Sequence, residues 1–259
     1  MTMQNTERKV YLFIGPQRSS TTSLYHSLRA SNDISFMDEK ENNYWQNPAA
    51  SFSEYITLFT NSDQVLAVDI CPQYFADVST LLRIAREQNN FHKVIFLHRN
   101  PIDRAKSFLK LQQAYGRDVF RLIHDEQFLL NFICYKNLNL CFRIFRPDKF
   151  QIIDVTNLNY YITQEFGIPN FTLAHVHKSF GRARFEKFNK YALPLILRFL
   201  RSFLELNRLV DWLKEHNLVR GFLFKNDKDF VQKEIDDVID CLYDDLLKEV
   251  TIVKNYFDS

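Results

Sequence analysis

The chain has 259 residues, of which 46% are hydrophobic and 25% charged, with 5 glycines and 7 prolines. This composition excludes an intrinsically disordered protein, and the length suits one large α/β domain over 1–259. The formal net charge of +2 provides no global field suited to a polyanion, so we expect no nucleic-acid partner.

Five short apolar segments are expected to form strands, and helical patterns lie between or after them. The expected strands are 9–14, 34–37, 65–69, 94–98 and 151–155. The expected helices are roughly 21–30, 51–60, 78–88, 101–115, 123–145, 157–166, 192–215 and 229–250. Strands that alternate with helices predict an α/β fold, with a central, mainly parallel sheet flanked by helices and a helical C-terminal part.

Two local patterns add detail to the expected helices, one at a helix start and one in the last helix. Asn100 followed by Pro101 is typical of a helix start, with asparagine as the cap and proline in the first turn. In the last helix, apolar residues recur at helical spacing and predict one buried stripe on an otherwise acidic helix. They are Val231, Ile235, Val238, Ile239, Leu242 and Leu246.

Lys and Arg outnumber Asp and Glu in residues 171–226, so this segment either forms a solvated face or meets an anionic ligand.

The cysteines and histidines indicate no metal site. Cys71, Cys134, Cys141 and Cys241 show neither CxxC spacing nor histidine partners at metal-ligand intervals. We therefore expect reduced, mostly buried thiols and no metal cofactor. His92, His98, His175 and His177 show no arrangement of a base and an orienting group, so we expect structural histidines.

No targeting or membrane segment is expected. The N-terminus is polar, and the apolar run that follows it is too short for a signal peptide. The nearest approach to a long apolar stretch, 191–206, is interrupted by Arg198 and Arg201, so a transmembrane span is not expected. These patterns predict a cytoplasmic location.

The segment GPQRSSTTSLYHSL, residues 15–28, joins an apolar strand to a helical pattern. In open α/β sheets, ligands bind beyond the carboxyl ends of strands, and a helix N-terminus there attracts anions. Arg18 adds a fixed positive charge, and a run of hydroxyl residues adds donors. That run comprises Ser19, Ser20, Thr21, Thr22 and Ser23.

The segment departs from a nucleotide-kinase loop. Ser20 and Thr21 stand where that motif requires glycine and lysine. The strand 94–98 ends in His98 and Arg99 rather than in an aspartate that could hold Mg²⁺. Asp69 does end another strand, where it could hold Mg²⁺, so a nucleotide kinase is kept as an alternative. The pattern favours an anion neutralised by arginines and backbone amides without a metal.

A second segment, LHRNPIDRAKSFLKL, places Arg99 at a strand end and Ser107 two turns into the next helix. Together they could grip a second phosphate, with the arginine contributing its bidentate fork. Arg104 and Lys106 lie on the same helix, and for Lys106 a solvated face is the preferred interpretation.

The two segments together resemble PAPS-dependent sulfotransferases, whose donor is 3′-phosphoadenosine 5′-phosphosulfate (PAPS). Residues 15–28 resemble the 5′-phosphosulfate loop, and RNPIDRAKSF resembles the 3′-phosphate motif. EKENNYW and VDICPQYF resemble two further segments of the glycan-type branch, and HVHKSFGRARF resembles the family's basic C-terminal loop. The likeness therefore covers most of the chain and implies a P-loop-like, five-stranded parallel sheet with the donor across its strand ends.

The resemblance assigns roles to the donor-binding residues. Arg18 stands where the family usually has lysine, in contact with the 5′-phosphate and the sulfuryl group. Pro16, Gln17 and Ser19 to Ser23 would hold the 5′-phosphosulfate, with Ser20 replacing a frequent glycine. Arg99 and Ser107 would bind the 3′-phosphate. Lys178, Gly181 and Arg182 are candidates for closing over it. The product would be adenosine 3′,5′-bisphosphate, and no metal is implied.

The family's base in the Lys-Glu segment corresponds to Glu41, and a carboxylate beside Lys40 could be tuned for general-base catalysis. Asp69, at a strand end, is the alternative base. The chain departs from the family pattern at two positions. Ile70 stands where the family has a catalytic lysine, and Asn43 stands where it has a histidine. Leaving-group stabilisation would then depend on Arg18, the loop amides and Lys40.

The acceptor is expected to be a small molecule with a hydroxyl or amine. A net charge of +2 does not suggest a groove for a long sulfated polymer, and the acidic run NDISFMDEKEN would tolerate a cation. A natural product such as a saxitoxin-type guanidinium alkaloid fits. Tyr44, Trp45, Tyr74 and Phe75 are the expected walls of the acceptor pocket. The alternatives are a P-loop kinase and a non-catalytic adenine-nucleotide-binding module.

Overall fold

The structure, a computed structural model, describes residues 8–61, 63–114, 117–122, 124, 133–174 and 232–258. The chain divides into two compact units. The first comprises Met1–Arg104, Leu130–His177 and Asp244–Ser259, and the second comprises Ala105–Leu129 and Lys178–Tyr243. The single domain over 1–259 stays a prediction.

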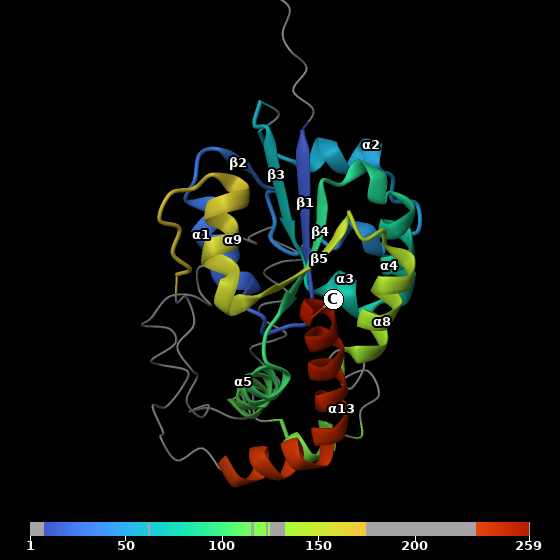
Figure 1. The fold of residues 1–259 in the computed structure, drawn as a ribbon, viewed down its shortest axis with the longest axis vertical. Helices are drawn as coiled ribbons and strands as arrows, with labels where there is room; N and C mark the ends of the chain where they lie inside the picture. The colour runs from blue at the N-terminus through green and yellow to red at the C-terminus, as the bar shows by residue number, and fades with distance from the viewer. Residues whose placement is uncertain are drawn as a thin grey trace, which may run out of the picture. The chain divides into compact units, whose positions relative to one another are not determined.

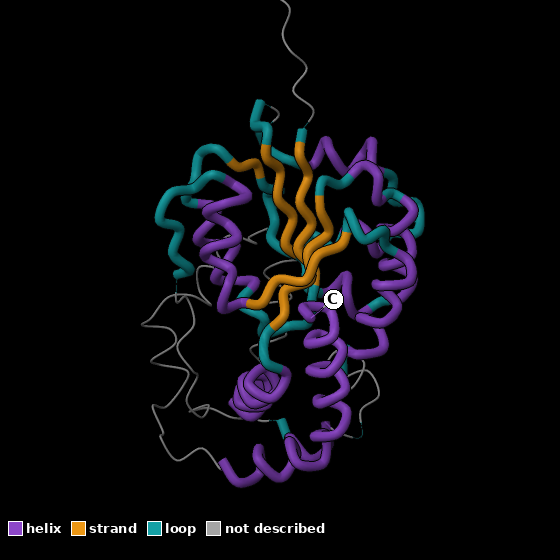
Figure 2. The backbone as a smooth tube through the Cα atoms, in the orientation of Figure 1, coloured by secondary structure: helices purple, strands orange, loops and turns teal. Residues whose placement is uncertain are grey.

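The first unit is built on a five-stranded parallel sheet (Figure 2). Its strands are β1 (Lys9–Ile14), β2 (Ile34–Ser35), β3 (Leu66–Ile70), β4 (Lys93–His98) and β5 (Phe150–Asp154). The order is β2-β3-β1-β4-β5, and every neighbouring pair is parallel. The expected sheet is therefore confirmed. β2 is shorter than expected, because Met37 instead forms an isolated antiparallel bridge with Phe59.

Helices cover both faces of this sheet within the first unit (Figure 1). One face packs against α1 (Thr21–Arg29) and α9 (Leu158–Phe166). The other face packs against α3 (Gln73–Ala76), α4 (Val78–Arg86) and α8 (Tyr135–Ile144). Burial on both faces explains why the strands read as nearly continuous apolar runs.

The central strand β1 shows how the two cores are separated. Successive side chains of a strand point to opposite faces. Tyr11 and Phe13 pack with α1 and α9, whereas Leu12 and Ile14 pack in the core on the α4 side. All four side chains are fully buried. The carboxyl end of β1 is thus held firmly on both faces, which fixes the start of the loop that follows.

The remaining elements are short, apart from two helices that each contain residues of both units. The short ones are η1 (Tyr44–Gln46), α2 (Phe52–Tyr55), η2 (Ile56–Leu58), η3 (Gln88–Asn90), α6 (Val119–Leu122) and η4 (Val155–Asn157). The long ones are α5 (Pro101–Ala114) and α13 (Gln232–Asp258). The helix expected over 51–60 is split into α2 and η2, and the one expected over 192–215 lies outside the described residues.

The first turn of α5 begins as the sequence indicates. The side-chain oxygen of Asn100 accepts hydrogen bonds from the backbone N–H groups of Ile102 and Asp103, at 3.0 and 3.2 Å. Pro101 occupies the first helical position, where its missing N–H costs no helical bond. The asparagine cap and proline start are confirmed.

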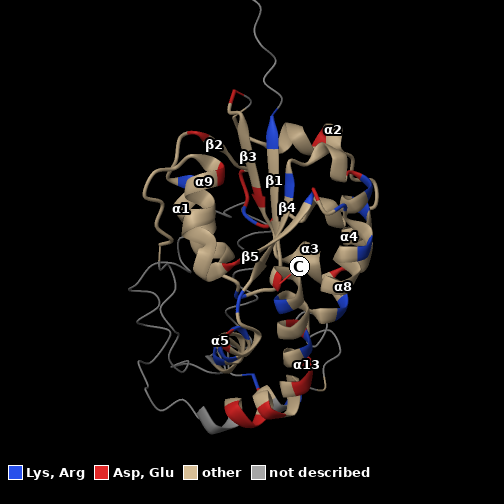
Figure 3. Cartoon of the chain, viewed as in Figure 1, with Lys and Arg blue, Asp and Glu red and all other residues tan. Residues whose placement is uncertain are grey.

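α13 carries the expected buried stripe at Ile235, Val238, Ile239, Leu242 and Leu246, which are all buried, and Val231 lies outside the described residues. Figure 3 shows acidic residues along the first turns of the same helix. The stripe continues past the expected residues to Glu249, whose side chain is 1% exposed.

Glu249 is buried because it pairs with Arg104 in the first unit. The guanidinium Nη1 and Nη2 atoms of Arg104 donate to the two carboxylate oxygens at 2.6 and 2.7 Å. Arg104 is 2% exposed, so it does not lie on a solvated helix face. Lys106 is 38% exposed in its side chain and pairs with Asp236. The bidentate pair joins the first turn of α5 to the C-terminal half of α13.

Cys71, Cys134 and Cys141 are buried and Cys241 is exposed, all four as free thiols. This confirms mostly buried, reduced cysteines. Among the described residues, no helix combines the length and apolar character needed to cross a bilayer. No cluster of three or more His, Cys, Asp or Glu side chains is arranged to hold a metal ion in that same part of the chain.

Candidate active site

The loop after β1 begins at a glycine that no other residue could replace without strain. Gly15 has φ +139, a backbone conformation that side chains disfavour. A Cβ atom at this position would lie 3.0 Å from the carbonyl oxygen of Leu97 on β4. The loop therefore leaves β1 in close contact with the carboxyl end of β4.

Two further loop residues adopt the left-handed conformation although they carry side chains. Arg18 has φ 69 and Ser20 has φ 61. Each such residue costs roughly 1–3 kcal/mol and persists only where the surrounding structure imposes it. The conformation at Ser20 explains why a glycine would suit this position. Ser20 is the N-cap of α1 but its side chain makes no capping hydrogen bond, so it satisfies none of the first-turn N–H groups.

A side chain from the second motif reaches this loop. The Arg99 Nη1 atom donates to the backbone carbonyl of Arg18 at 3.0 Å. The two residues are 81 positions apart in the sequence, and both belong to the first unit. The structure thus brings together the two arginines that the sequence singles out for an anion.

Ser19 is the most deeply buried hydroxyl residue of the loop, with no exposed surface. Its Oγ atom has no hydrogen-bond partner among the described residues. An unsatisfied buried polar group costs about 1–3 kcal/mol, so a ligand that met this hydroxyl would recover that cost. Pro16 and Thr21 are also buried, and Gln17, Thr22 and Ser23 are partly exposed.

The Lys-Glu segment lies against the first turn of α1. Lys40 Nζ donates to Thr22 Oγ1 at 3.1 Å and forms an ion pair with the carboxylate of Glu41. Glu41 and Asn43 both have positive φ, 62 and 58. One ammonium group thereby connects the predicted base to the predicted phosphosulfate loop.

Asp69 lies at the carboxyl end of β3, buried on the face that carries α4. The Tyr55 hydroxyl donates to its Oδ2 atom at 2.9 Å. The pKa of Asp69 is raised to about 6, and the largest cause is burial. The nearby charge of Glu41 also raises this pKa, whereas hydrogen bonds from Tyr55 and Tyr74 lower it. The Glu41 carboxylate is therefore close enough to Asp69 to influence the protonation of Asp69.

Of the four aromatic residues expected to line an acceptor pocket, Tyr44 and Trp45 pack beside Tyr55, the hydrogen-bond partner of Asp69. Trp45, Tyr74 and Phe75 are at most 2% exposed and pack in the hydrophobic core. The Tyr74 hydroxyl donates to Asn42 Oδ1 at 2.9 Å, and Tyr44 is partly buried beside Tyr55. Contact of these side chains with an acceptor stays a prediction.

Several predicted donor residues cannot be placed with this group. Ser107 lies in the part of α5 that belongs to the second unit. Lys178, Gly181 and Arg182, like His175 and His177, lie outside the described residues. Their roles remain as the resemblance implies them.

The structure contains one pair that the sequence analysis missed. His98 Nδ1 lies 2.8 Å from Asp154 Oδ2, so a histidine expected to be merely structural has an orienting carboxylate after all. The two residues end the neighbouring strands β4 and β5 and are directly opposite in register. The sequence places both at strand ends, but only the strand order makes them partners.

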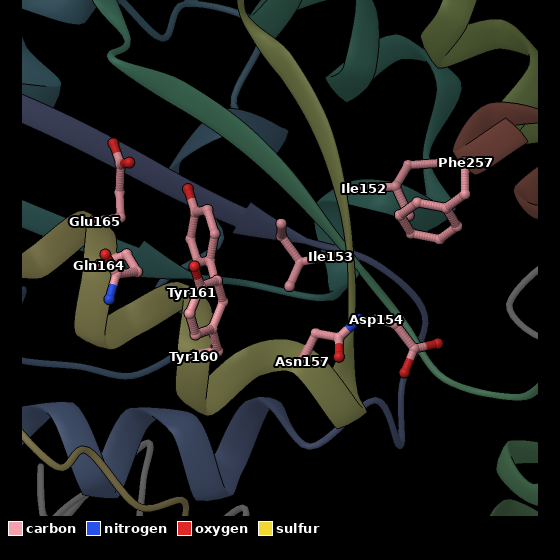
Figure 4. Close-up of a pocket in the computed structure, with 9 residues that line it drawn as sticks. All are labelled: Ile152, Ile153, Asp154, Asn157, Tyr160, Tyr161, Gln164, Glu165 and Phe257. Atoms are coloured by element: carbon pink, nitrogen blue, oxygen red, sulfur yellow. The ribbon is translucent and has the colours of Figure 1, made fainter. Parts of the chain in front are cut away.

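A shallow hollow lies elsewhere on the first unit, against β5 and α9 (Figure 4). It is lined by Ile152, Ile153, Asp154, Asn157, Tyr160, Tyr161, Gln164, Glu165 and Phe257. None of the predicted site residues that the structure describes lines it. Figure 4 shows the Asp154 carboxylate directed away from the two tyrosines.

No family model matches the chain, and no curated protein matches it. Among solved structures, the chain is similar to a sulfotransferase from Alicyclobacillus acidocaldarius, with a TM-score of 0.55. The match covers 95% of this chain and 96% of that one at 12% sequence identity. The chain therefore has the P-loop-like α/β fold seen in that sulfotransferase.

Proposed function

We propose that this chain is a sulfotransferase that moves a sulfuryl group from PAPS to a hydroxyl or amine of a small-molecule acceptor. The observation that carries the proposal is the hydrogen bond from Arg99 to the Arg18 carbonyl. It joins the candidate 5′-phosphosulfate loop to the candidate 3′-phosphate arginine. The shared fold with a solved sulfotransferase is consistent with this assignment.

The donor supplies an activated sulfuryl group on its 5′-phosphate, and the chain's residues fit such a ligand. Arginine forks and helix N-terminal amides both favour phosphate oxygens. The Arg99 guanidinium contacts the Arg18 carbonyl, and the residue after Arg18, Ser19, has a buried hydroxyl without a hydrogen-bond partner among the described residues. In this proposal these groups neutralise the donor without a metal ion.

Glu41 is the proposed general base. Its role is to accept the proton of the acceptor hydroxyl or amine as that atom bonds to sulfur. Its contact with Lys40, which also donates to Thr22, supports this role because the three groups connect the base to the donor loop. Lys40 would stabilise charge on the leaving phosphate oxygen, in place of the catalytic lysine that Ile70 replaces.

Asp69 is proposed to orient the acceptor or to act as the alternative base. It is buried and engaged by Tyr55, which suits an orienting role better than contact with bulk water. The acidic pair Glu41 and Asp69 favours a neutral or cationic acceptor over an anionic one. A natural product, including a guanidinium alkaloid of the saxitoxin type, satisfies this requirement.

The test is sulfuryl transfer from radiolabelled PAPS into a metabolite extract, followed by purification of the labelled product. We expect a labelled small molecule, and a Glu41→Gln variant that is slower by about 10²–10⁴-fold. Full activity of the variant would remove the base assignment. Absence of transfer with intact binding of adenosine 3′,5′-bisphosphate would leave a non-catalytic nucleotide-binding module as the better function.

A P-loop kinase is separated by ligand preference. The kinase would be stabilised against thermal unfolding by ATP with Mg²⁺, because its loop and strand aspartate hold the metal nucleotide. The proposed transferase is expected to be stabilised by adenosine 3′,5′-bisphosphate in the presence of EDTA. A preference for ATP with Mg²⁺ would overturn the proposal.

A further inference from the structure

The pair formed by His98 and Asp154 is built like a base with its orienting group. Asp154 Oδ1 accepts hydrogen bonds from the Thr156 backbone N–H and hydroxyl, at 2.8 and 2.6 Å. Its Oδ2 faces His98 Nδ1 at 2.8 Å. Those hydrogen bonds favour the ionised carboxylate and lower the pKa of Asp154. A fixed carboxylate at Nδ1 keeps the proton on that nitrogen and stabilises an imidazolium ring if one forms.

The other ring nitrogen, Nε2, has no hydrogen-bond partner among the described residues. His98 is 8% exposed, and its Nε2 atom is buried without a hydrogen bond to any described residue. A buried polar atom left unpaired is destabilising, because it loses its hydrogen bonds to water and gains none in return. Such an exception in a folded chain calls for an explanation, and a ligand that approaches Nε2 would provide one.

The position of His98 indicates which ligand that is. On the strand next to β4, Ile14 is in register with Phe96, and Gly15 approaches the backbone of Leu97. The first residues of the phosphate loop are therefore level with the end of β4. The residue after His98 is Arg99, which contacts the loop carbonyl of Arg18. All of these residues belong to the first unit.

We propose that His98 is a further nucleotide-binding residue, whose Nε2 donates a hydrogen bond to a phosphate oxygen of the nucleotide held at this loop. The ring takes up a proton when the nucleotide binds, because both nitrogens must then be donors. The inference rests on the proposed function, and it assigns a role that the sequence analysis did not give to any histidine.

The neighbouring elements carry charges of both signs. Asp154 on β5 faces His98 Nδ1, Arg99 is the next residue, and Arg18 lies in the loop that Arg99 contacts. A phosphate opposite Nε2 would add a negative charge that an N–H donor at this atom can meet.

Among the described residues, two ion pairs connect α5 to α13, the exposed pair of Lys106 with Asp236 and the buried pair of Arg104 with Glu249. The buried pair makes a bidentate contact within itself. Each pair is neutral as a whole, so neither adds net charge.

The experiment is isothermal titration calorimetry of the full chain with adenosine 3′,5′-bisphosphate at pH 7.5 in EDTA, repeated in buffers of different ionisation enthalpy. The dependence on buffer gives the number of protons taken up. Proton changes on the nucleotide itself are common to all variants, so the difference between wild type and His98→Gln reports His98. We expect wild type to take up more protons than His98→Gln on binding, and His98→Gln to bind roughly 10–100-fold more weakly.

Two variants keep the test independent of folding. Asp154→Asn removes the charge and replaces one of the two acceptor oxygens by an NH₂ group, so it can accept from Thr156 or from His98 Nδ1 but not from both. It should reduce proton uptake more than affinity. His92→Gln is the matched control, because His92 also lies near a carboxylate, 3.4 Å from Glu165 Oε1, but precedes the amino end of β4. It should bind the nucleotide like wild type.

The nucleotide series identifies which phosphate is the partner. If the difference in proton uptake between wild type and His98→Gln persists with adenosine 5′-monophosphate, the 5′-phosphate is the partner. If it appears only with adenosine 3′,5′-bisphosphate, the partner is the 3′-phosphate. Equal affinity and equal proton uptake in wild type and His98→Gln would overturn this inference alone. Failure of wild type to bind the bisphosphate would overturn the proposed function with it.

Discussion

Replacing Glu249 by glutamine should destabilise the first unit strongly. Glu249→Gln keeps the shape of the side chain but removes the charge that Arg104 requires. One carboxylate oxygen becomes an NH₂ group, which faces a guanidinium N–H as donor against donor. Both charge-assisted hydrogen bonds, at 2.6 and 2.7 Å, are therefore weakened or lost.

The magnitude follows from burial. Arg104 is 2% exposed, so water cannot replace the lost partner, and the nearby Cys134 sulfur at 3.4 Å is a weak acceptor. Breaking a buried ion pair by removing one partner costs about 3–5 kcal/mol. For a chain of this size, that corresponds to a fall in Tm of roughly 6–20 °C.

Urea unfolding followed by circular dichroism measures this change, and the chain offers a matched control. Arg146 and Asp148 form an equally bidentate pair, at 3.0 Å for both bonds, but each side chain is 56% exposed. Asp148→Asn should change the free energy of unfolding by at most about 1 kcal/mol. Replacing both Arg104 and Glu249 by apolar residues of similar volume should recover much of the loss.

The comparison of Glu249→Gln with Asp148→Asn tests whether burial makes the pair of Arg104 and Glu249 stabilising. If Glu249→Gln cost no more than Asp148→Asn, the buried pair would not stabilise the junction between α5 and α13, and the reasoning from burial would be wrong.

Two further changes test the loop and the buried carboxylate. Gly15→Ala should lower the free energy of unfolding by about 2–5 kcal/mol and weaken nucleotide binding, because the new Cβ meets the Leu97 carbonyl at 3.0 Å in a strained conformation. Thermal unfolding measures the stability and calorimetry measures the binding. Wild-type values in both would contradict the assignment of this loop. The pKa of Asp69 is raised to about 6 in the folded state. The folded state therefore binds this proton more tightly than the unfolded chain does. As a result, the contribution of Asp69 to stability declines as the pH rises from about 4 to above 6. Asp69→Asn should therefore gain about 2–3 kcal/mol relative to wild type between pH 4 and pH 7, and a difference that does not vary with pH would show that Asp69 is not held protonated by burial.

Local patterns predicted the sheet well, because strand and loop signals are contained in short segments. The apolar run 9–14, the asparagine cap at Asn100 and the buried stripe of α13 each depend on residues near one another in the sequence. The likeness between the two phosphate segments and a known family also depends on local residues.

What could not be predicted depends on contacts between distant segments. The burial of Arg104 follows from a glutamate 145 positions later, so its helix position alone left its environment open. The partnership of His98 with Asp154 requires the strand order β4-β5. Similarly, the raised pKa of Asp69 depends on Tyr55 and on burial that only the packed structure defines.

A crystal structure with adenosine 3′,5′-bisphosphate, obtained in the presence of EDTA, tests the central claim most directly. The claim is that arginine and amide donors hold a doubly phosphorylated adenosine at the end of β1 without a metal. We expect one phosphate within hydrogen-bonding distance of the first-turn N–H groups of α1 and of Arg18, and the other on the Arg99 guanidinium. A nucleotide bound elsewhere, with neither arginine in contact with it, would contradict the account.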